Sequence, residues 1–353
     1  MIERWRRGEL GALPVVLGLV VVAVVFQSLN PNFLSPRNLT NLGLQIAAMA
    51  TLSCGLVLVL LLGEIDLSAG AVSGLAAAVM AVSGLEGPLG LGAALLTGAA
   101  VGLFQGGWIT RLAVPSFVVT LAGLLAWQGA QLAVLGPTGS LNLTDPFITS
   151  LCSTFLPAWA ALAVAAPVLV LAKGPWRAAL LLLTVGVAAL FAFDRGLPLA
   201  LLIVIGVITC TDLLVRRTRF GRHLVATGGN LEAARRAGID VGRVRVTVFV
   251  IASTLAALGG VLAASRLLAV NQSSGSGDLL LNAIAAAVIG GTSLFGGRGS
   301  VWSALSGSLA IGAISNGMDL LGLASPVKFV VTGGVLLLAV TVDSLARLRR
   351  RAR

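Results

Sequence analysis

The scarcity of charge along this chain constrains its fold more than any other feature. Charged residues make up 10% of its 353 residues, whereas a soluble domain carries about 25%. That is too few charges to cover a water-facing surface. The apolar runs are continuous rather than alternating, which is typical of membrane helices and not of an outer-membrane barrel. The sequence therefore predicts an all-α, polytopic helical membrane protein.

The apolar runs also set the expected membrane crossings. Several runs are shorter than the roughly 20 residues that a full crossing needs, so tilted, broken or re-entrant spans are expected among them. The chain is therefore expected to cross the bilayer roughly ten to twelve times. The expected spans lie near residues 11–29, 43–62, 66–83, 88–108, 115–135, 158–172, 178–193, 198–215, 246–268, 279–295, 300–318 and 327–345.

Arginine clusters at the ends of the apolar runs predict the topology. The net charge is +11, but positive charge that flanks apolar spans marks the cytoplasmic side rather than a nucleic-acid partner. Clusters within 4–7 and 347–353 place both the N-terminus and the C-terminus in the cytoplasm, as do the arginines of the loop 216–245. The loop 136–157 has no Lys or Arg and is expected outside. Residues 1–353 are expected to form a single transmembrane domain.

A polar, arginine-rich insert, Gly221–Arg245, separates two of the apolar runs and must leave the lipid. Within it, Asn230–Gly238 is predicted to be a short capped helix. Asn230 accepts hydrogen bonds from the first free backbone N–H groups, and Gly238 takes the left-handed closing position. Such a helix on the cytoplasmic face can receive force from a soluble partner. The chain has no G-x-x-x-x-G-K-[ST] phosphate loop, so any ATP hydrolysis is expected on a separate chain.

A second segment, Gly63–Gly70, carries two carboxylates, Glu64 and Asp66, between two apolar runs. Carboxylates inside a membrane are costly and usually functional. One interpretation is a short interfacial turn or gate region, in which Asp66 or Ser68 caps the next helix. The other is direct contact with a substrate or a proton.

The glycine-rich loop Gly290–Ser300 does not have the spacing of a phosphate loop and has apolar runs on both sides. It is predicted to be a tight turn between spans, with Arg298 at the cytoplasmic interface. The three cysteines and the single histidine, His223, form no pattern of a disulfide framework or a metal site. No cofactor is expected.

Polar residues within or near the spans have two interpretations. They line a path and exchange hydrogen bonds with a hydroxyl-rich solute, or they bond neighbouring helices and solvate span ends. The set is Gln45, Gln105, Gln128, Gln131, Asn282, Asn316 and Asp319. The candidate gate or translocation-path residues are Glu64, Asp66, Ser68, Gln128, Asn282 and Asn316.

Three segments together resemble the permease subunits of sugar ABC importers, in particular the xylose-type and ribose-type branch. They are Gly221–Arg245, Ala283–Ser300 and Asn316–Gly322. The resemblance implies a permease domain in the bacterial cytoplasmic (inner) membrane that pairs with a second copy of itself. It also implies ATP-binding cassette ATPase subunits as partners and an extracytoplasmic sugar-binding protein. The residues implied to couple the permease to the ATPase are Asn230, Glu232, Ala233, Ala234, Arg235 and Gly238.

The function expected from this resemblance is import of a monosaccharide, a pentose such as xylose or ribose, by alternating access. The chain departs from the family at two positions: Asn282 stands where an acidic residue is usual, and Glu64 where a glycine is common. Two alternatives stay open. One is an ion-coupled secondary transporter with Glu64 and Asp66 as proton or sodium sites. The other is a membrane scaffold that transports nothing and whose insert recruits a soluble protein.

Overall fold

The computed structural model describes residues 13–157, 159–160 and 194–351. The helices are α2 (Leu13–Leu29), α3 (Pro36–Leu62), α4 (Ala69–Val82), α5 (Pro88–Arg111), α6 (Ser116–Leu135), α7 (Pro146–Ser153), α10 (Leu199–Arg217), α11 (Arg219–Gly229), α12 (Leu231–Arg236), α13 (Val241–Leu267), α14 (Gly277–Ile289), α15 (Ser303–Leu320) and α16 (Ser325–Arg351). The short strands are β1 (Ser140–Asn142), β2 (Phe155–Leu156), β3 (Leu197–Pro198) and β4 (Ala269–Asn271). The predicted all-α fold is confirmed.

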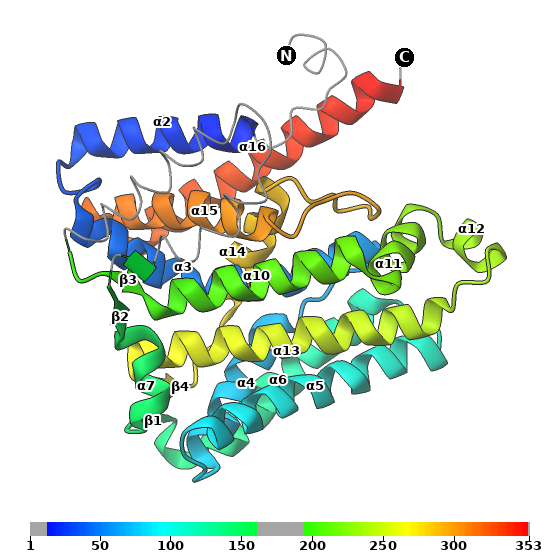
Figure 1. The fold of residues 1–353 in the computed structure, drawn as a ribbon, viewed down its shortest axis with the longest axis horizontal. Coiled ribbons are helices and arrows are strands. Elements are labelled where there is room, and N and C mark those ends of the chain that lie inside the picture. The colour runs from blue at the N-terminus through cyan, green and yellow to red at the C-terminus, as the bar shows by residue number, and fades with distance from the viewer. Residues whose placement is uncertain (1–12, 158, 161–193, 352–353) are drawn as a thin grey trace.

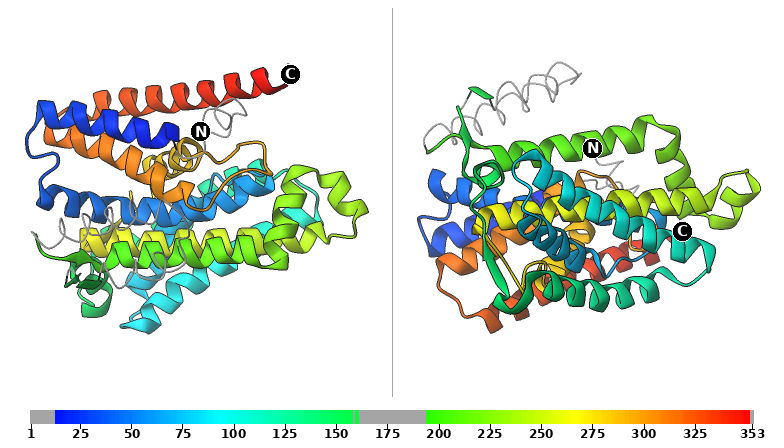
Figure 2. Two further views of the ribbon diagram at one scale, coloured as in Figure 1. Left: turned by 45° about the horizontal axis from the view of Figure 1, so that its top comes forward. Right: turned by 90° about the horizontal axis from the view of Figure 1, so that it is seen from below.

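The bundle has two ends with different structures. Helices α11 and α12 project from one end, which we call the insert end (Figures 1 and 2). Helix α7 and the short strands lie at the opposite end, the strand end (Figure 1). There β1 pairs antiparallel with β4, with Ser140 opposite Asn271, and β2 pairs with β3. The two strand pairs therefore join segments that are far apart in the sequence.

The core is built around α3 and α13. Ser35 caps the start of α3 by accepting a hydrogen bond from the Asn38 N–H, and Gly63 ends the helix with a left-handed φ of 81°. Of its most apolar window, 89% is buried inside the bundle, so α3 faces protein rather than lipid. Helix α13 packs against α3, α4 and α5.

Three glycines bring α5 and α13 into backbone contact. A Cβ atom at Gly98 would lie 2.5 Å from the Ser253 carbonyl oxygen, and one at Gly102 would lie 2.4 Å from the Phe249 carbonyl oxygen. Gly106 approaches α13 in the same way, one turn further along. Small residues allow this close approach between membrane helices. We call this row of contacts the glycine seam.

Among the described residues, five helices are long and apolar enough to cross a membrane: α3, α5, α6, α10 and α13. Two expected spans are corrected. The expected spans 66–83 and 279–295 are helical over Ala69–Val82 and Gly277–Ile289 only. Each of these helices is about 20 Å long, against about 30 Å of hydrocarbon. Apart from residues 159–160, the expected spans 158–172 and 178–193 lie outside the described residues.

The two short helices begin inside the bundle and run in opposite directions. Ser68, just before α4, meets Gln105, which lies roughly 9 Å inside the end of α5 at Arg111. Gly275, just before α14, packs on the Gly70 carbonyl. From there α4 runs to the strand end, where the Gly87 N–H donates to Asp145. Helix α14 runs to the insert end and closes against Ser303.

Two loops hold more structure than the sequence indicated. The insert contains α11 as well as the predicted short helix, because Gly221, Leu224 and Thr227 recur every three residues and form a buried face. The loop 136–157 contains α7, whose first turn is capped by Asp145 through the Phe147 N–H at 2.8 Å.

Candidate functional site

Helix α12 is capped at both ends as predicted. The Asn230 Oδ1 accepts a hydrogen bond from the Ala233 N–H at 2.9 Å. Gly238 adopts a left-handed φ of 78°, and its N–H donates to the Arg235 carbonyl at 3.0 Å. These caps satisfy backbone groups that a helix this short leaves free at each end. Both ends of this helix therefore lie where the local sequence predicted them.

The outer surface of α12 is polar and exposed. Ala234 turns inward and is 3% exposed, whereas Glu232, Ala233 and Arg235 face the solvent. Glu232 and Arg235 form an exposed ion pair at 3.5 Å. Exposed arginines of the same end surround it, namely Arg216, Arg217, Arg219, Arg222, Arg236 and Arg243. Helix α12 lies at the tip of the insert end (Figure 1), and the exposed residues of this end are rich in arginine.

The insert is joined to the core through glycine contacts, which we call the glycine junction: Gly63, Gly228, Gly296 and Gly297. A Cβ atom at Gly228 would lie 1.8 Å from the Leu61 carbonyl oxygen. That oxygen accepts a hydrogen bond from the Gly297 N–H at 2.9 Å. The junction thus brings the ends of α11 and α3 and the loop before α15 into backbone contact. The predicted tight turn at 290–300 is present as this loop.

Glu64 forms an ion pair across the core with Arg245, in the first turns of α13, at 2.7 Å. Their side chains are 13% and 22% exposed, so the two charges compensate each other in a largely dry place. Sequence reasoning singled out Glu64 but missed this partner, since nothing local links the two residues. The pair gives Glu64 a structural role, because its carboxylate compensates the charge of Arg245.

Asp66 caps the start of α4. Its Oδ1 accepts hydrogen bonds from the Ser68 N–H at 2.8 Å and from the Ser68 hydroxyl at 2.7 Å, and the Gln105 amide donates to that hydroxyl at 2.8 Å. Ser68 itself makes no capping bond. Within the described residues, Asp66 Oδ2 and Trp127 Nε1 are buried without a partner. These contacts agree with the interpretation of the segment as a short turn in which Asp66 caps the next helix.

The remaining path candidates lie on separate helices. Asn316 on α15 is buried and exchanges two hydrogen bonds with Asn38 on α3, at 2.7 and 3.1 Å. This contact pairs two helices, and Asn38 was not singled out because its partner is distant in sequence. Gln128 and Asn282 are half-buried on α6 and α14. The structure therefore groups Glu64, Asp66 and Ser68 in one segment and leaves the other three apart.

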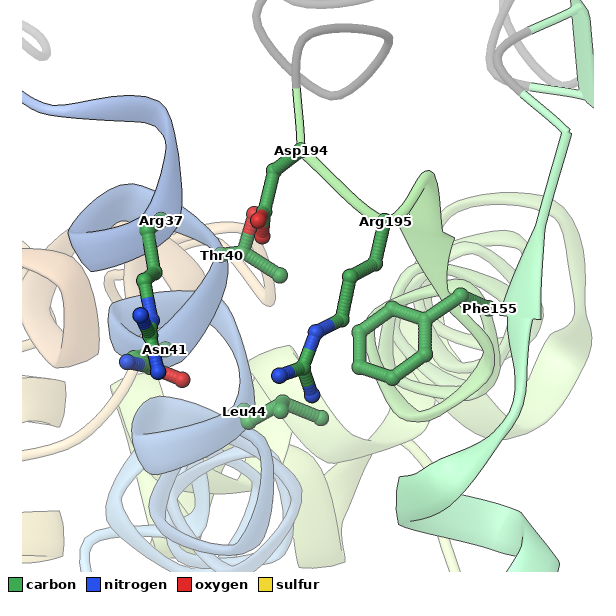
Figure 3. Close-up of a pocket in the computed structure, with 7 residues that line it drawn as sticks. All are labelled: Arg37, Thr40, Asn41, Leu44, Phe155, Asp194 and Arg195. Atoms are coloured by element: carbon green, nitrogen blue, oxygen red, sulfur yellow. The ribbon is translucent and has the colours of Figure 1, made fainter.

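The strand end carries a cationic pocket of about 240 Å³. In Figure 3, Arg37 and Arg195 point into it from opposite sides, with Asp194 above them. The Arg195 guanidinium lies 5.8 Å from the centre of the Phe155 ring. At this distance the face of the ring attracts the positive charge. Thr40, Asn41 and Leu44 complete the lining.

Comparison with known proteins was made over the whole chain. The family described as "Branched-chain amino acid transport system / permease component" matches residues 38–340. The chain is 34% identical to the xylose transport system permease protein of Escherichia coli, over 95% of this chain and 92% of that protein. It is 32% identical to the xylose transport system permease protein of Haemophilus influenzae, over 94% and 96% of the two chains. It is 33% identical to the ribose import permease protein of Bacillus subtilis, over 95% and 94%. No solved structure matches.

Proposed function

This chain belongs to the family described as "Branched-chain amino acid transport system / permease component", and we propose that it is the permease subunit of an ATP-driven monosaccharide importer. The cargo is a pentose such as xylose or ribose, as the names of the similar permeases indicate. The chain is a multi-pass protein of the bacterial cytoplasmic membrane and works by alternating access. ATP is hydrolysed on separate ATP-binding cassette chains.

The observation that carries this proposal is the capped helix α12 and its connection to the core. Its tip presents Glu232, Ala233 and Arg235 to solvent. Its base leads through α11 to the glycine junction, where backbone touches backbone at Gly228 and Leu61. A short rigid element with a charged tip and a stiff base suits the receipt of force from a soluble partner.

The path of this force through the molecule follows from the same contacts. Closure of two ATP-loaded ATPases displaces α12 and α11 toward or away from the bundle axis. The glycine junction passes the movement to the end of α3 and to the loop before α15. The Glu64–Arg245 pair ties the segment Gly63–Ser68 to α13. The short helix α4, which continues from that segment, moves with it and opens or closes the path.

The two ends of the bundle suit two different soluble partners. ATPase subunits bind at the insert end. An extracytoplasmic sugar-binding protein docks at the strand end, where the Arg37–Arg195 pocket offers positive charge to an acidic surface (Figure 3). A second copy of the permease completes the transport path, and the apolar outer faces of α5 and α6 contact lipid.

The ion-coupled alternative is not favoured. A proton or sodium site at Glu64 would need this carboxylate to be available, and it is already paired with Arg245. The Asp66 carboxylate already accepts hydrogen bonds from the Ser68 N–H and hydroxyl at the start of α4. The names of two relatives describe each of them as the permease protein of a xylose transport system, which favours a multi-subunit importer over a single-chain carrier.

Co-purification with the ATPase encoded nearest to this chain tests the proposal. The tagged parent chain is expected to capture the ATPase, and Glu232→Arg is expected to lose it, because three adjacent cations then replace the mixed charges of the α12 tip. Glu86→Arg at the strand end is the matched charge reversal and should capture normally. Failure of the parent chain to capture the ATPase would contradict the ATP-driven function. Normal capture and uptake by Glu232→Arg would remove α12 from the coupling role.

A further inference from the structure

A cavity lies between α4, α13 and the segment 271–276 that leads into α14. Its volume is about 220 Å³, which equals that of about seven water molecules at the density of the liquid. It sits on the strand-end side of the contact between Gly70 and Gly275. The backbone contact therefore forms its inner limit, at the depth where α4 and α14 begin.

The walls of the cavity have two chemistries. Hydroxyls and an amide come from Ser73, Asn271, Ser273, Ser274 and Ser276, which we call the polar wall. Apolar side chains come from Ala77, Ala263, Ala264, Leu267 and Leu279, which we call the alanine and leucine wall. No Asp, Glu, Lys or Arg side chain belongs to its lining. A sugar ring has the same division, with hydroxyl edges and C–H faces, and carries no charge that needs a counterion.

The polar wall is held in place before any ligand arrives. The Gln131 amide on α6 donates to the carbonyls of Asn271 and Ser274 at 2.9 and 3.0 Å. The pairing of β4 with β1 fixes Asn271 opposite Ser140. Gly74 lets α4 approach so closely that a Cβ atom there would lie 2.1 Å from the Ser274 carbonyl oxygen. Binding sites for small molecules are usually preformed in this way.

Two polar groups of this wall remain available to a ligand. Asn271 Oδ1 already accepts from the Ser273 N–H and hydroxyl at 3.0 and 2.8 Å. In the part of the chain that the structure describes, Asn271 Nδ2 and the Ser276 hydroxyl have no protein partner. The first donates a hydrogen bond and the second both donates and accepts, which matches the needs of vicinal hydroxyl groups.

We propose that this cavity binds one monosaccharide that enters from the strand end, before the sugar passes between the starts of α4 and α14. The inference rests on the proposed importer function and gives it a site. The polar wall receives the sugar hydroxyls, and the alanine and leucine wall receives a C–H face. The sugar then moves toward the insert end along the path that the second copy of the permease completes.

Thiol protection tests the site directly. Ser276→Cys is made in the full permease–ATPase–binding-protein complex, reconstituted in vesicles without ATP. Its labelling by a small hydrophilic methanethiosulfonate reagent is followed with rising D-xylose or D-ribose. Saturating sugar is expected to slow the labelling by about tenfold or more, since the labelled fraction falls with site occupancy. Leucine is expected to give no protection, because an amino acid brings two charges that this wall does not match.

Two controls make the labelling decisive. Ser153→Cys lies exposed at the end of α7, away from the cavity lining, and its labelling reports any shielding by the binding protein at the strand end. Sugar is expected to slow the labelling of Ser276→Cys more than that of Ser153→Cys. The parent chain gives the background from native cysteines. Unchanged labelling of Ser276→Cys at every sugar concentration, in a complex that still imports sugar, would overturn the assignment. Protection by leucine instead of sugar would overturn the ligand class.

Filling the cavity is the second measurement. Ala263→Phe is expected to lower uptake kcat/KM by about tenfold or more, with ATPase capture unchanged. Ala100→Phe, on an exposed face of α5, is the matched control. If the parent complex imports no sugar with ATP, the proposed function itself fails. If the parent imports sugar, Ala263→Phe transports normally and Ser276→Cys is not protected, only the cavity assignment fails.

Discussion

At the scale of single residues, the segment Gly63–Ser68 is held by two kinds of polar contact. The Glu64–Arg245 pair holds its first part by charge. The chain of hydrogen bonds from Gln105 through Ser68 to Asp66 holds its last part without a counterion. A largely buried charge that loses its partner is costly, while an exposed pair contributes little. The Glu64–Arg245 pair is therefore expected to contribute more to stability than the exposed Asp240–Arg243 pair at the start of α13.

Glu64→Gln tests this difference. The substitution leaves Arg245 largely buried with no compensating charge, so the purified complex is expected to lose up to about 3 kcal/mol of stability. Thermal unfolding in one detergent measures the change, and the combined Glu64→Arg and Arg245→Glu variant should recover part of it. Arg243→Gln breaks the exposed pair with Asp240 and should leave the midpoint unchanged. Equal midpoints for parent and Glu64→Gln would contradict the proposed weight of the pair.

At the scale of elements, glycines allow helices to pack in direct backbone contact. The two adjacent glycines at the end of α11, Gly228 and Gly229, differ in whether they make such a contact. A Cβ atom at Gly228 meets the Leu61 carbonyl oxygen at 1.8 Å, whereas one at Gly229 meets nothing within 4 Å. Neither residue has a positive φ. A methyl group at the first position must therefore push α11 away from α3, and at the second it points into open space.

Gly228→Ala and Gly229→Ala form a matched pair for the glycine junction. Gly228→Ala is expected to reduce ATP-driven uptake by about tenfold or more through misplacement of α12, while the protein still inserts and captures the ATPase. Gly229→Ala should transport like the parent. Uptake in proteoliposomes with a fixed amount of assembled complex is the measurement. Equal loss in both variants would point to helix propensity rather than to the contact with Leu61.

The sequence predicted those elements whose signals are local. Asn230 and Gly238 lie at the ends of one short helix, so their types alone indicate its caps. The contact of Glu64 with Arg245 and that of Asn38 with Asn316 join residues far apart in the chain, and no local pattern carries them. The start of α4 and the end of α14 were also misplaced. The expected spans included residues 66–68 and 290–295, which are not helical, because the limits of an apolar run do not show where the helix begins or ends.

At the scale of the whole molecule, charge divides the two ends. The insert end gathers the arginines around α12, and the C-terminal end of α16 lies toward the same end (Figure 1). The strand end holds few basic residues, among them Arg37 and Arg195. Clusters of positive charge stay on the cytoplasmic side of bacterial membranes. The insert end is therefore expected to face the cytoplasm.

Single cysteines at the two ends test this orientation. Ser153→Cys is expected to react with a membrane-impermeant maleimide in intact cells. Ala237→Cys, exposed just after α12, is expected to react only after the membrane is opened. The parent chain serves as background, and burial raises the pKa of its Cys152 thiol, which slows reaction there. Labelling of both variants in intact cells would contradict the assigned topology.

The glycine seam between α5 and α13 has a consequence for how the protein moves. Where two backbones touch at Gly98, Gly102 and Gly106, no side chain lies between them that could change rotamer and absorb a shift. Helices α5 and α13 are therefore expected to move as one rigid body through the transport cycle. Movement is then expected in the elements that pack against them, above all the short helices α4 and α14 and the segments that lead into them. The rate of transport is therefore expected to depend on how easily α4 and α14 move along the rigid surface of α5 and α13.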